Sequence, residues 1–556
     1  MMNTPALKED GPWPANGVEA SIVGGRLRVG RVIANSGRDI LAMVENSEEA
    51  RSALHLGDVL IIKGHESCVL GVISGMNVPA PGLEGHDEDL WLVQVELTGT
   101  LTRDADTPSF HRNIPLAPSL GDGVYKAALS DLQLLFRNGD KTAYPIGKVI
   151  GADRVLATID PEELLKGGLA ILGTSGAGKS STLASLVRAL LRHRHPVTSL
   201  LIDPYNEYGA SFGKAAITIS PSPGLFPHWL LSFEEMVWVL SRNGGELDKD
   251  ERSILEEAIP AARLRFAARA TRPHEDQFSV TNMVSVDTPI PYRIMDLIGH
   301  LEKSTHSDET RPSAAYQRLR TRMMAAVADP RLSVIFGNAT AKDSLGSLIT
   351  KLFRLEKNDA PMAVLQLGAL TDGVDKLVVS VVCRLASALA EWGGSPRKTL
   401  ILIEDAARFA PASPSDKAAK LSLAALRRLG ERPRKLGTCL GFVTSHARGM
   451  HTDVLRRSGT FFIHRIPGQA DAELVEDILP EAAMAFMGSV GSLGQGEAIG
   501  IGRGVPASGR IAISPLPPAA IPANTMFKEQ EAAAAPQTIE EMVQRWRYAG
   551  MQDLSG

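Results

Sequence analysis

Short apolar runs separated by turn-forming residues characterise the first hundred positions of the chain. Residues 91–98 alternate between apolar and other side chains, as expected for a largely half-buried strand. Five or six such strands predict a small β-barrel over residues 23–125, after a polar and flexible segment at 1–22. We expect this barrel to serve structure or assembly. Its other apolar runs lie at 29–33, 40–44, 59–62 and 69–73.

From about residue 151 the chain changes to strongly apolar, strand-length runs that alternate with helical periodicity. This pattern predicts an α/β fold with a parallel sheet. Residues 232–345 have mostly helical periodicity and predict an inserted helical subdomain between two parts of the core, 151–231 and 346–512. We expect a connector at 126–150, and a Pro-rich linker with a C-terminal helix at 513–556. The apolar runs lie at 169–172, 199–203, 362–367, 399–403, 438–445 and 460–466.

A phosphate-loop pattern follows the first of these runs: glycine, four residues, then Gly-Lys-Ser. A buried strand before it and helical periodicity over 181–193 supply the structural context that the motif needs. Backbone N–H groups and the helix dipole would bind phosphate, a solvent-facing Lys179 would reach the β- and γ-phosphates of ATP, and Ser180 would hold Mg²⁺. The predicted nucleotide-binding residues are Gly173, Thr174, Ser175, Gly176, Ala177, Gly178, Lys179, Ser180 and Ser181.

The second buried run ends in the sequence Asp-Pro-Tyr-Asn-Glu-Tyr, residues 203–208. In an open parallel sheet, ligands bind at the carboxyl ends of the strands, which is where this segment begins. Glu207 is therefore a candidate for orienting a water or Mg²⁺. The alternative, that Asp203 only caps the next turn, is equally supported.

A later apolar run ends in two acids, Glu404 and Asp405. In phosphate-loop ATPases one such acid belongs to the Mg²⁺ shell and the other polarises the attacking water. By position, Glu404 takes the metal role and Asp405 the role of the base. The metal ligands expected from the chain are thus Ser180 and Glu404.

Two further positions are candidates for charge and phosphate sensing. Arg434 lies in a basic loop and would place its positive charge beside the γ-phosphate bound in a neighbouring subunit. A solvated basic loop explains the spacing equally well. Ser445 follows a strand run at a position where a polar residue can sense the γ-phosphate. Arg265, Arg269 and Arg272 lie on one helical face, which is either a DNA contact or, with more support, a solvated surface.

Composition adds limits to this interpretation. The chain has 556 residues, enough for several domains, and a net charge of −4, so any contact with nucleic acid must use a local basic surface. Three widely spaced cysteines and the absence of a signal-like N-terminus or a membrane-length apolar run lead us to expect a cytoplasmic protein with no membrane contact.

Taken in order, these motifs resemble those of the HerA-like hexameric ATPases, relatives of the FtsK-type DNA translocases. The resemblance covers residues 27–512 and includes the barrel, the phosphate loop, the segments 203–208 and 286–293, Glu404 to Phe409, 434–437 and 453–455. It implies a RecA-like core with a HAS-type barrel, ATP and Mg²⁺ as ligands, and a homo-hexamer around double-stranded DNA. It also implies an effector partner: a NurA-like nuclease, a sirtuin-type NAD-degrading enzyme or another nuclease, in anti-phage defence or DNA end processing.

The chain departs from the family pattern at three points. The acid pair usually closes in Glu-Ala-His, whereas Asp405-Ala406-Ala407 stands here; the sensor glutamine falls at Ser445, and the arginine after it at His446. The base is one methylene shorter, and a misplacement of about 1 Å can cost on the order of 100-fold in rate. Two functions therefore remain: an ATP-driven DNA translocase or helicase, and an ATP-binding ring scaffold that activates its effector with little turnover.

Overall fold

The computed structural model describes most of the chain, in two compact units. The described residues are 22–23, 26–37, 39–64, 68–77, 91–104, 107–136, 143–242, 244–270, 284–307, 313–337, 341–356, 360–392, 398–431, 437–479, 484–523, 539 and 543. One unit comprises Met1–His195, Gly441–Arg448 and Leu455–Pro518, and the other comprises Pro196–Leu440, Gly449–Val454 and Ala519–Gly556.

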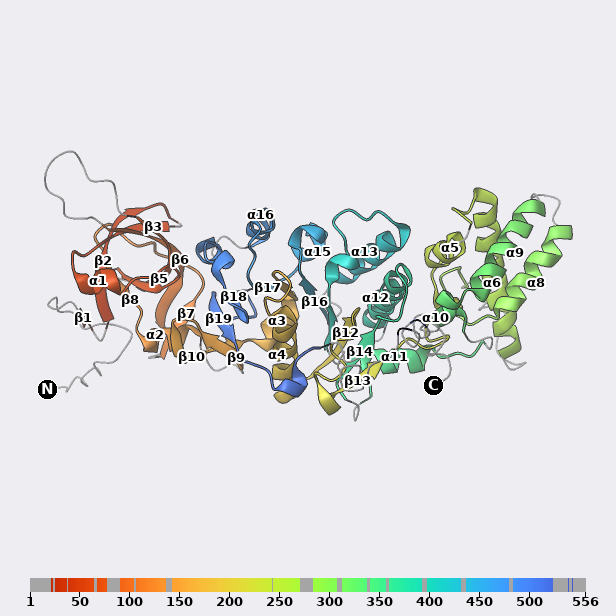
Figure 1. Ribbon diagram of the computed structural model, residues 1–556, viewed down its shortest axis with the longest axis horizontal. Helices are drawn as coiled ribbons and strands as arrows, with labels where there is room; N and C mark the ends of the chain where they lie inside the picture. The colour runs from red at the N-terminus through yellow and green to blue at the C-terminus, as the bar shows by residue number, and fades with distance from the viewer. Residues whose placement is uncertain are drawn as a thin grey trace. The chain divides into compact units, whose positions relative to one another are not determined.

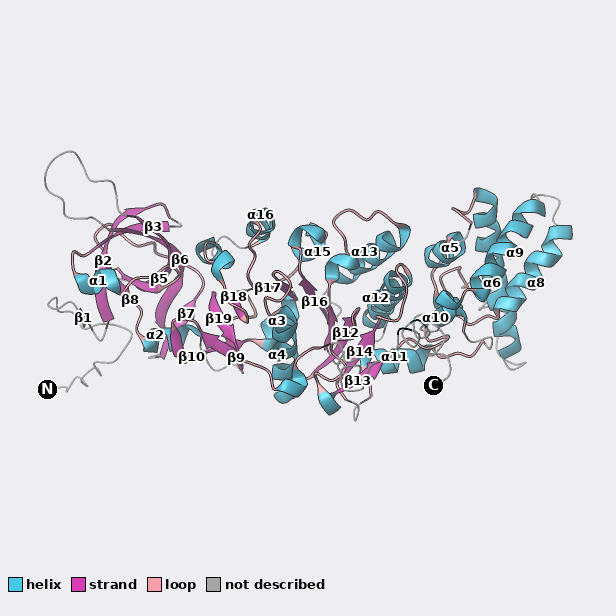
Figure 2. Cartoon of the chain, in the orientation of Figure 1, coloured by secondary structure: helices cyan, strands magenta, loops and turns pink. Residues whose placement is uncertain are grey.

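The first unit begins with a closed barrel of six strands, in the order β2-β3-β6-β5-β4-β8, with β8 pairing back to β2 (Figures 1 and 2). Alternate apolar side chains of these strands fill its interior, as the alternating pattern predicts. Strand β8 and helix α2 lie at and after the end of the predicted barrel range. The elements are β1 (Ile22–Val23), β2 (Arg26–Asn35), β3 (Asp39–Val44), α1 (Glu48–Ser52), β4 (Val59–Lys63), β5 (Cys68–Asn77), β6 (Leu92–Asp104), β7 (Thr107–His111), β8 (Gly123–Lys126) and α2 (Leu129–Phe136).

The same unit contains strands in the order β10-β9-β19-β18-β17-β11-β16. Strand β11 is parallel to β16 and β17, but β17, β18, β19, β9 and β10 pair antiparallel, so this part of the sheet is mixed. The bounds are β9 (Tyr144–Val149), β10 (Ala152–Ile159), α3 (Pro161–Gly167), β11 (Leu169–Leu172), α4 (Lys179–Arg192), β16 (Thr438–Thr444), β17 (Thr460–Ile463), α16 (Gln469–Ile478), α17 (Met484–Met487), β18 (Glu497–Gly502) and β19 (Gly509–Ile513).

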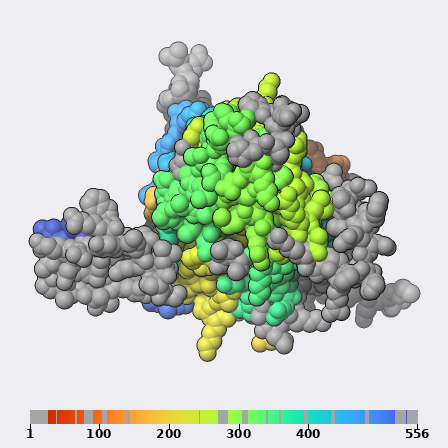
Figure 3. Space-filling view, turned by 90° about the vertical axis from the view of Figure 1, so that its right-hand side faces the viewer, coloured from red at the N-terminus to blue at the C-terminus, as the bar shows by residue number. Residues whose placement is uncertain are grey.

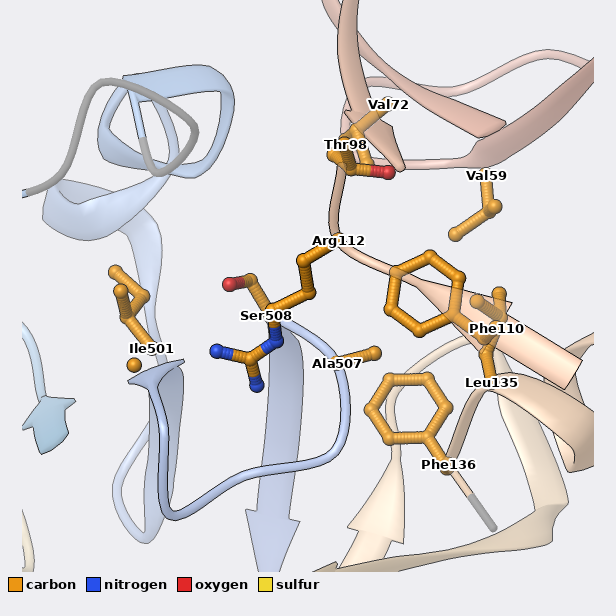
Figure 4. A pocket seen from close by; sticks show the side chains of 11 residues that line it. Val59, Val72, Thr98, Phe110, Arg112, Leu135, Phe136, Ile501, Ala507 and Ser508 are labelled. Atoms are coloured by element: carbon orange, nitrogen blue, oxygen red, sulfur yellow. The ribbon is translucent and has the colours of Figure 1, made fainter. Parts of the chain in front are cut away.

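A cavity of about 140 Å³ lies within this first unit, between the barrel, α2 and the β18–β19 hairpin (Figure 4). Phe110, Leu135 and Phe136 form an apolar side of it. Arg112 reaches across the hairpin and donates hydrogen bonds to the carbonyls of Val505 and Pro506. These contacts fix the hairpin against the barrel.

The second unit carries four parallel strands in the order β15-β12-β14-β13. Strand β12 is buried along its whole length, as its apolar sequence predicts, and α11 packs on β12 and β14. The strands are β12 (Val197–Asp203), β13 (Ala216–Ile219), β14 (Met362–Gln366) and β15 (Lys398–Ile403).

Several helices lie between β13 and β14 in the chain, and α8 and α9 make up much of the surface in Figure 3. Helix α5 begins at a capping box in which Ser232 and Glu235 satisfy each other's backbone N–H groups. Arg265 donates to His300 Nδ1 at 3.2 Å; the side chain of Arg269, and Arg272, lie outside the described residues. These helices are α5 (Phe233–Ser241), α6 (Lys249–Ala270), α8 (Ile294–Ser307), α9 (Ser313–Ala328), α10 (Ser333–Phe336) and α11 (Leu345–Phe353). Helix α12 (Val374–Trp392) follows β14, and α13 (Lys417–Gly430) follows β15.

Candidate functional site

The phosphate loop runs from the end of β11 to the start of α4. Gly173, Gly176 and Gly178 all have positive φ angles, which L side chains rarely adopt. A Cβ atom at Gly173 would lie 2.6 Å from the Cβ of His464, so the loop also needs glycine for close approach. Gly178 is the N-cap of the 14-residue helix α4 and has no side chain to cover its first N–H groups, a geometry suited to an anion.

Lys179 differs from its expected solvent-facing position. Its side chain is only 6% exposed, and Nζ donates to the carbonyl of Thr174 in the loop at 2.9 Å. Lys179 is the first residue of α4, and the hydrogen bond from Nζ to Thr174 turns its side chain back to the loop that precedes the helix. Ser180 and Ser181 are half-buried on the same helical turn.

Residues distant in sequence form hydrogen bonds that hold the phosphate loop. The sequence patterns did not predict these contacts. The N–H of Thr174 donates to the carbonyl of Arg465, and the N–H of Gly496 donates to the carbonyl of Ala177, both at 3.0 Å. His464 is fully buried, its Nε2 lies 3.0 Å from Thr182 Oγ1, and its N–H donates to the carbonyl of Leu172 at 2.8 Å. The only available sequence sign was a histidine directly after a strand run.

The strand ends of this unit converge on the loop. Leu172 is paired with Thr444 of β16 on one side and with Ile463 of β17 on the other. Ser445 and His464 therefore follow the two strands that flank β11, at the same edge as Gly173. Ser445 is half-buried at this edge.

Burial lowers the pKa of His464 to about 4, and the positive charge of Lys179 adds to this effect. The native state therefore keeps His464 neutral while the unfolded chain, with an ordinary histidine pKa near 6.5, binds a proton below that pH. Stability should fall as pH decreases from about 6.5 to 4, by about 3 kcal/mol from this residue. Urea midpoints measured between pH 7 and 4 should show that His464→Gln loses less stability than the parent as the pH decreases.

The matched control for that measurement is His55→Gln, because His55 is 74% exposed. The control retains His464, so its loss of stability in acid should include the full contribution of that residue. An unchanged acid loss in His464→Gln would show that His464 titrates normally in the native state.

In the second unit, Asp203 at the end of β12 caps the following turn. Its carboxylate accepts backbone N–H bonds from Tyr205 at 3.3 Å, Glu207 at 3.1 Å and Tyr208 at 2.9 Å. Burial raises the pKa of Asp203, and these N–H donors partly oppose that shift. The structure therefore shows the hydrogen bonds by which Asp203 caps the turn. Glu207 lies on the same turn, half-buried, with its carbonyl accepting from Ala523 N–H at 2.9 Å.

The acid pair follows β15, and two tyrosines of the 203–208 segment bind it. Tyr208 donates its hydroxyl to Glu404 Oε2 at 2.5 Å, and Tyr205 donates to Asp405 Oδ2. Glu404 is 7% exposed, whereas Asp405 is half-buried and has a left-handed backbone with φ of 49°. Burial, followed by the bond to Asp405, raises the pKa of Tyr205 to about 12, so the phenol stays protonated at neutral pH. The sequence did not indicate this pairing of tyrosine and acid.

Other predicted features are only partly visible. Arg434 lies outside the described residues. Among the residues that the structure describes, no group of three or more His, Cys, Asp and Glu side chains is arranged to hold a metal ion. The described helices also include none that is long and apolar enough to cross a membrane.

The fold and the loop define the class: a phosphate-loop ATPase with a mixed α/β sheet and an N-terminal six-stranded barrel. Within this class, residues 144–386 match the family described as "Helicase HerA, central domain".

Several known proteins are similar to the chain. The DNA double-strand break repair helicase HerA of Pyrococcus furiosus is 22% identical over 488 residues, which cover 81% of this chain and 83% of that protein. A probable HerA helicase of Methanocaldococcus jannaschii is also 22% identical, over 82% of this chain and 90% of its own. Among solved structures, VirB4 of Thermoanaerobacter pseudethanolicus is 18% identical and aligns over 69% of this chain and 99% of its own, with a TM-score of 0.47. The plasmid coupling protein TrwB in complex with ADP and Mg²⁺ is 16% identical over 70% of this chain and 92% of its own, with a TM-score of 0.43.

Proposed function

We propose that the protein is an ATP-driven DNA translocase or helicase that forms a homo-hexameric ring around double-stranded DNA. The observation that carries the proposal is the phosphate loop, with three positive-φ glycines, a buried lysine and an open helix N-terminus. The match of residues 144–386 to the HerA central domain supports DNA as the substrate on which the ATPase acts.

The proposed ligands are ATP and Mg²⁺. Loop N–H groups and Lys179 bind the phosphates, and Ser180 and Glu404 provide the oxygen ligands for Mg²⁺. Mg²⁺ usually takes one or two protein oxygens and completes its shell with phosphates and water, so a dedicated cluster of acidic ligands is not required. When bound, the metal neutralises phosphate charge.

Asp405 acts in this proposal as the base that polarises the attacking water, and Glu207 helps to orient it. Ser445 senses the γ-phosphate. Arg434 stabilises transition-state charge in a neighbouring subunit, which makes turnover depend on ring formation. A nuclease or an NAD-degrading enzyme is the proposed effector, with anti-phage defence or DNA end processing as the setting.

The second candidate is an ATP-binding ring scaffold with little turnover. It is favoured by the short side chain of Asp405, which also accepts a hydrogen bond from Tyr205. An alanine at 407 and a serine at 445 add to this argument.

ATP turnover with and without duplex DNA separates the two functions. For a translocase we expect measurable hydrolysis that rises several-fold with duplex DNA, because hydrolysis is coupled to movement along the bound DNA. Glu404→Gln is the matched control, because it keeps the shape of the side chain but weakens the metal ligand. It should hydrolyse no ATP, either with or without duplex DNA. Nucleotide binding without hydrolysis, unchanged by DNA, would favour the scaffold.

A further inference from the structure

The turn that carries Tyr205 is rigidly anchored. Asp203 fixes it from within through three backbone N–H bonds. Asn206 has a left-handed backbone with φ of 58°, and its Oδ1 accepts the N–H of Gly368 at 3.1 Å. Tyr205 is therefore mounted on a fixed support rather than on a loose surface loop.

Asp405 is held from the other side as well. It begins the short 3₁₀ turn Ala406–Arg408, and Arg408 Nε donates to Asp375 Oδ2 at 2.6 Å. Asp375 is buried and its other oxygen accepts the N–H groups of Gly373 and Lys376 at 2.9 and 2.8 Å. The left-handed φ of Asp405 is uncommon for a non-glycine residue and needs such support from its surroundings.

The remaining freedom of Asp405 is rotation of its carboxylate. The hydroxyl of Tyr205 binds Oδ2, which fixes that rotation and leaves Oδ1 as the oxygen for a water. A carboxylate has lone pairs for about four hydrogen bonds, so one phenol does not exhaust it. Tyr205 is 42% exposed, and removal of its hydroxyl would leave no buried void.

We propose that Tyr205 is a positioning residue that aims Oδ1 of Asp405 at the attacking water and so compensates for its short side chain. The inference rests on the proposed role of Asp405 as base. The water's proton passes to Oδ1 while its oxygen forms the new bond to the γ-phosphorus, and the bond from that phosphorus to the bridging oxygen breaks, so that ADP leaves with that oxygen and inorganic phosphate is formed. Tyr205 keeps its own proton throughout. Because active-site groups must be held within about 0.5 Å, loss of the phenol should affect the rate.

A double-mutant cycle tests this coupling. Tyr205→Phe should lower kcat by about 10-fold, a fraction of the 100-fold that a misplacement of about 1 Å can cause. The KM for ATP and the calorimetric affinity should stay within about twofold, since a positioning residue acts on the chemical step. In an Asp405→Glu background, whose longer carboxylate extends past the phenol, Tyr205→Phe should have less than about twofold effect.

Tyr144→Phe is the control for loss of a tyrosine hydroxyl, because that hydroxyl bonds His195 Nδ1 at 3.2 Å. It should keep the parent's kcat. An unchanged or raised kcat in Tyr205→Phe would overturn the inference, as would an equal loss in the parent and in Asp405→Glu. The role of Asp405 as the base is tested separately with Asp405→Asn. If this variant hydrolyses ATP as fast as the parent, the proposed mechanism is wrong, regardless of the result for Tyr205→Phe.

Discussion

Lys179→Ala is expected to abolish ATP binding, with an affinity at least about 100-fold weaker than that of the parent. Removing one partner of a desolvated charge pair costs about 2–5 kcal/mol, much of it from the charge left behind. Lys179 is only 6% exposed and its ammonium is already bonded to the Thr174 carbonyl of the loop, so the parent needs little rearrangement to bind phosphate. Calorimetric titration with ATP and Mg²⁺ measures the difference.

Lys166→Ala is the matched control, since Lys166 is an exposed lysine in an ion pair with Glu163. It should bind ATP as the parent does. Circular dichroism and thermal melting show whether Lys179→Ala keeps its fold after losing a buried side chain. A folded Lys179→Ala protein with the parent's affinity would refute the phosphate-loop assignment.

Asp405→Asn is expected to remove hydrolysis while nucleotide still binds. The amide keeps the size of the side chain but cannot take the water's proton, and general-base catalysis contributes roughly 10²–10⁴-fold. The effect should be a loss of kcat in that range, measured by phosphate release from purified rings, with calorimetric affinity unchanged.

Asp405→Glu is the companion variant. If the native base is limited by reach, the longer side chain raises turnover above that of the parent. Equal rates in the parent and in Asp405→Asn would mean that Asp405 is not the base, and would favour the scaffold.

The parts of the site that local sequence determines could be predicted. Strand β11, the glycine loop and helix α4 are consecutive in the chain, and each has its own pattern: an apolar run, obligatory glycines and helical periodicity. The acid pair could be located in the same way, because it directly follows the buried strand β15 in the sequence.

The contacts that bring distant segments together could not be predicted. His464 and Gly496 support the phosphate loop only because β17 and the hairpin that follows return beside β11. Likewise, Tyr205 meets Asp405 because β12 and β15 are neighbours, about 200 positions apart in sequence. Short antiparallel strands such as β18 and β19 have weak periodicity, and their pairing is set by the tertiary fold.

The support of the phosphate loop by Gly496 has a consequence for protein synthesis. Domains emerge from the ribosome amino end first, at about 5–20 residues per second. The loop at 173–180 is made early, but the backbone that supports Ala177 follows more than 300 residues later. The nascent chain therefore lacks this contact with the phosphate loop until Gly496 has been made and has folded back beside Ala177.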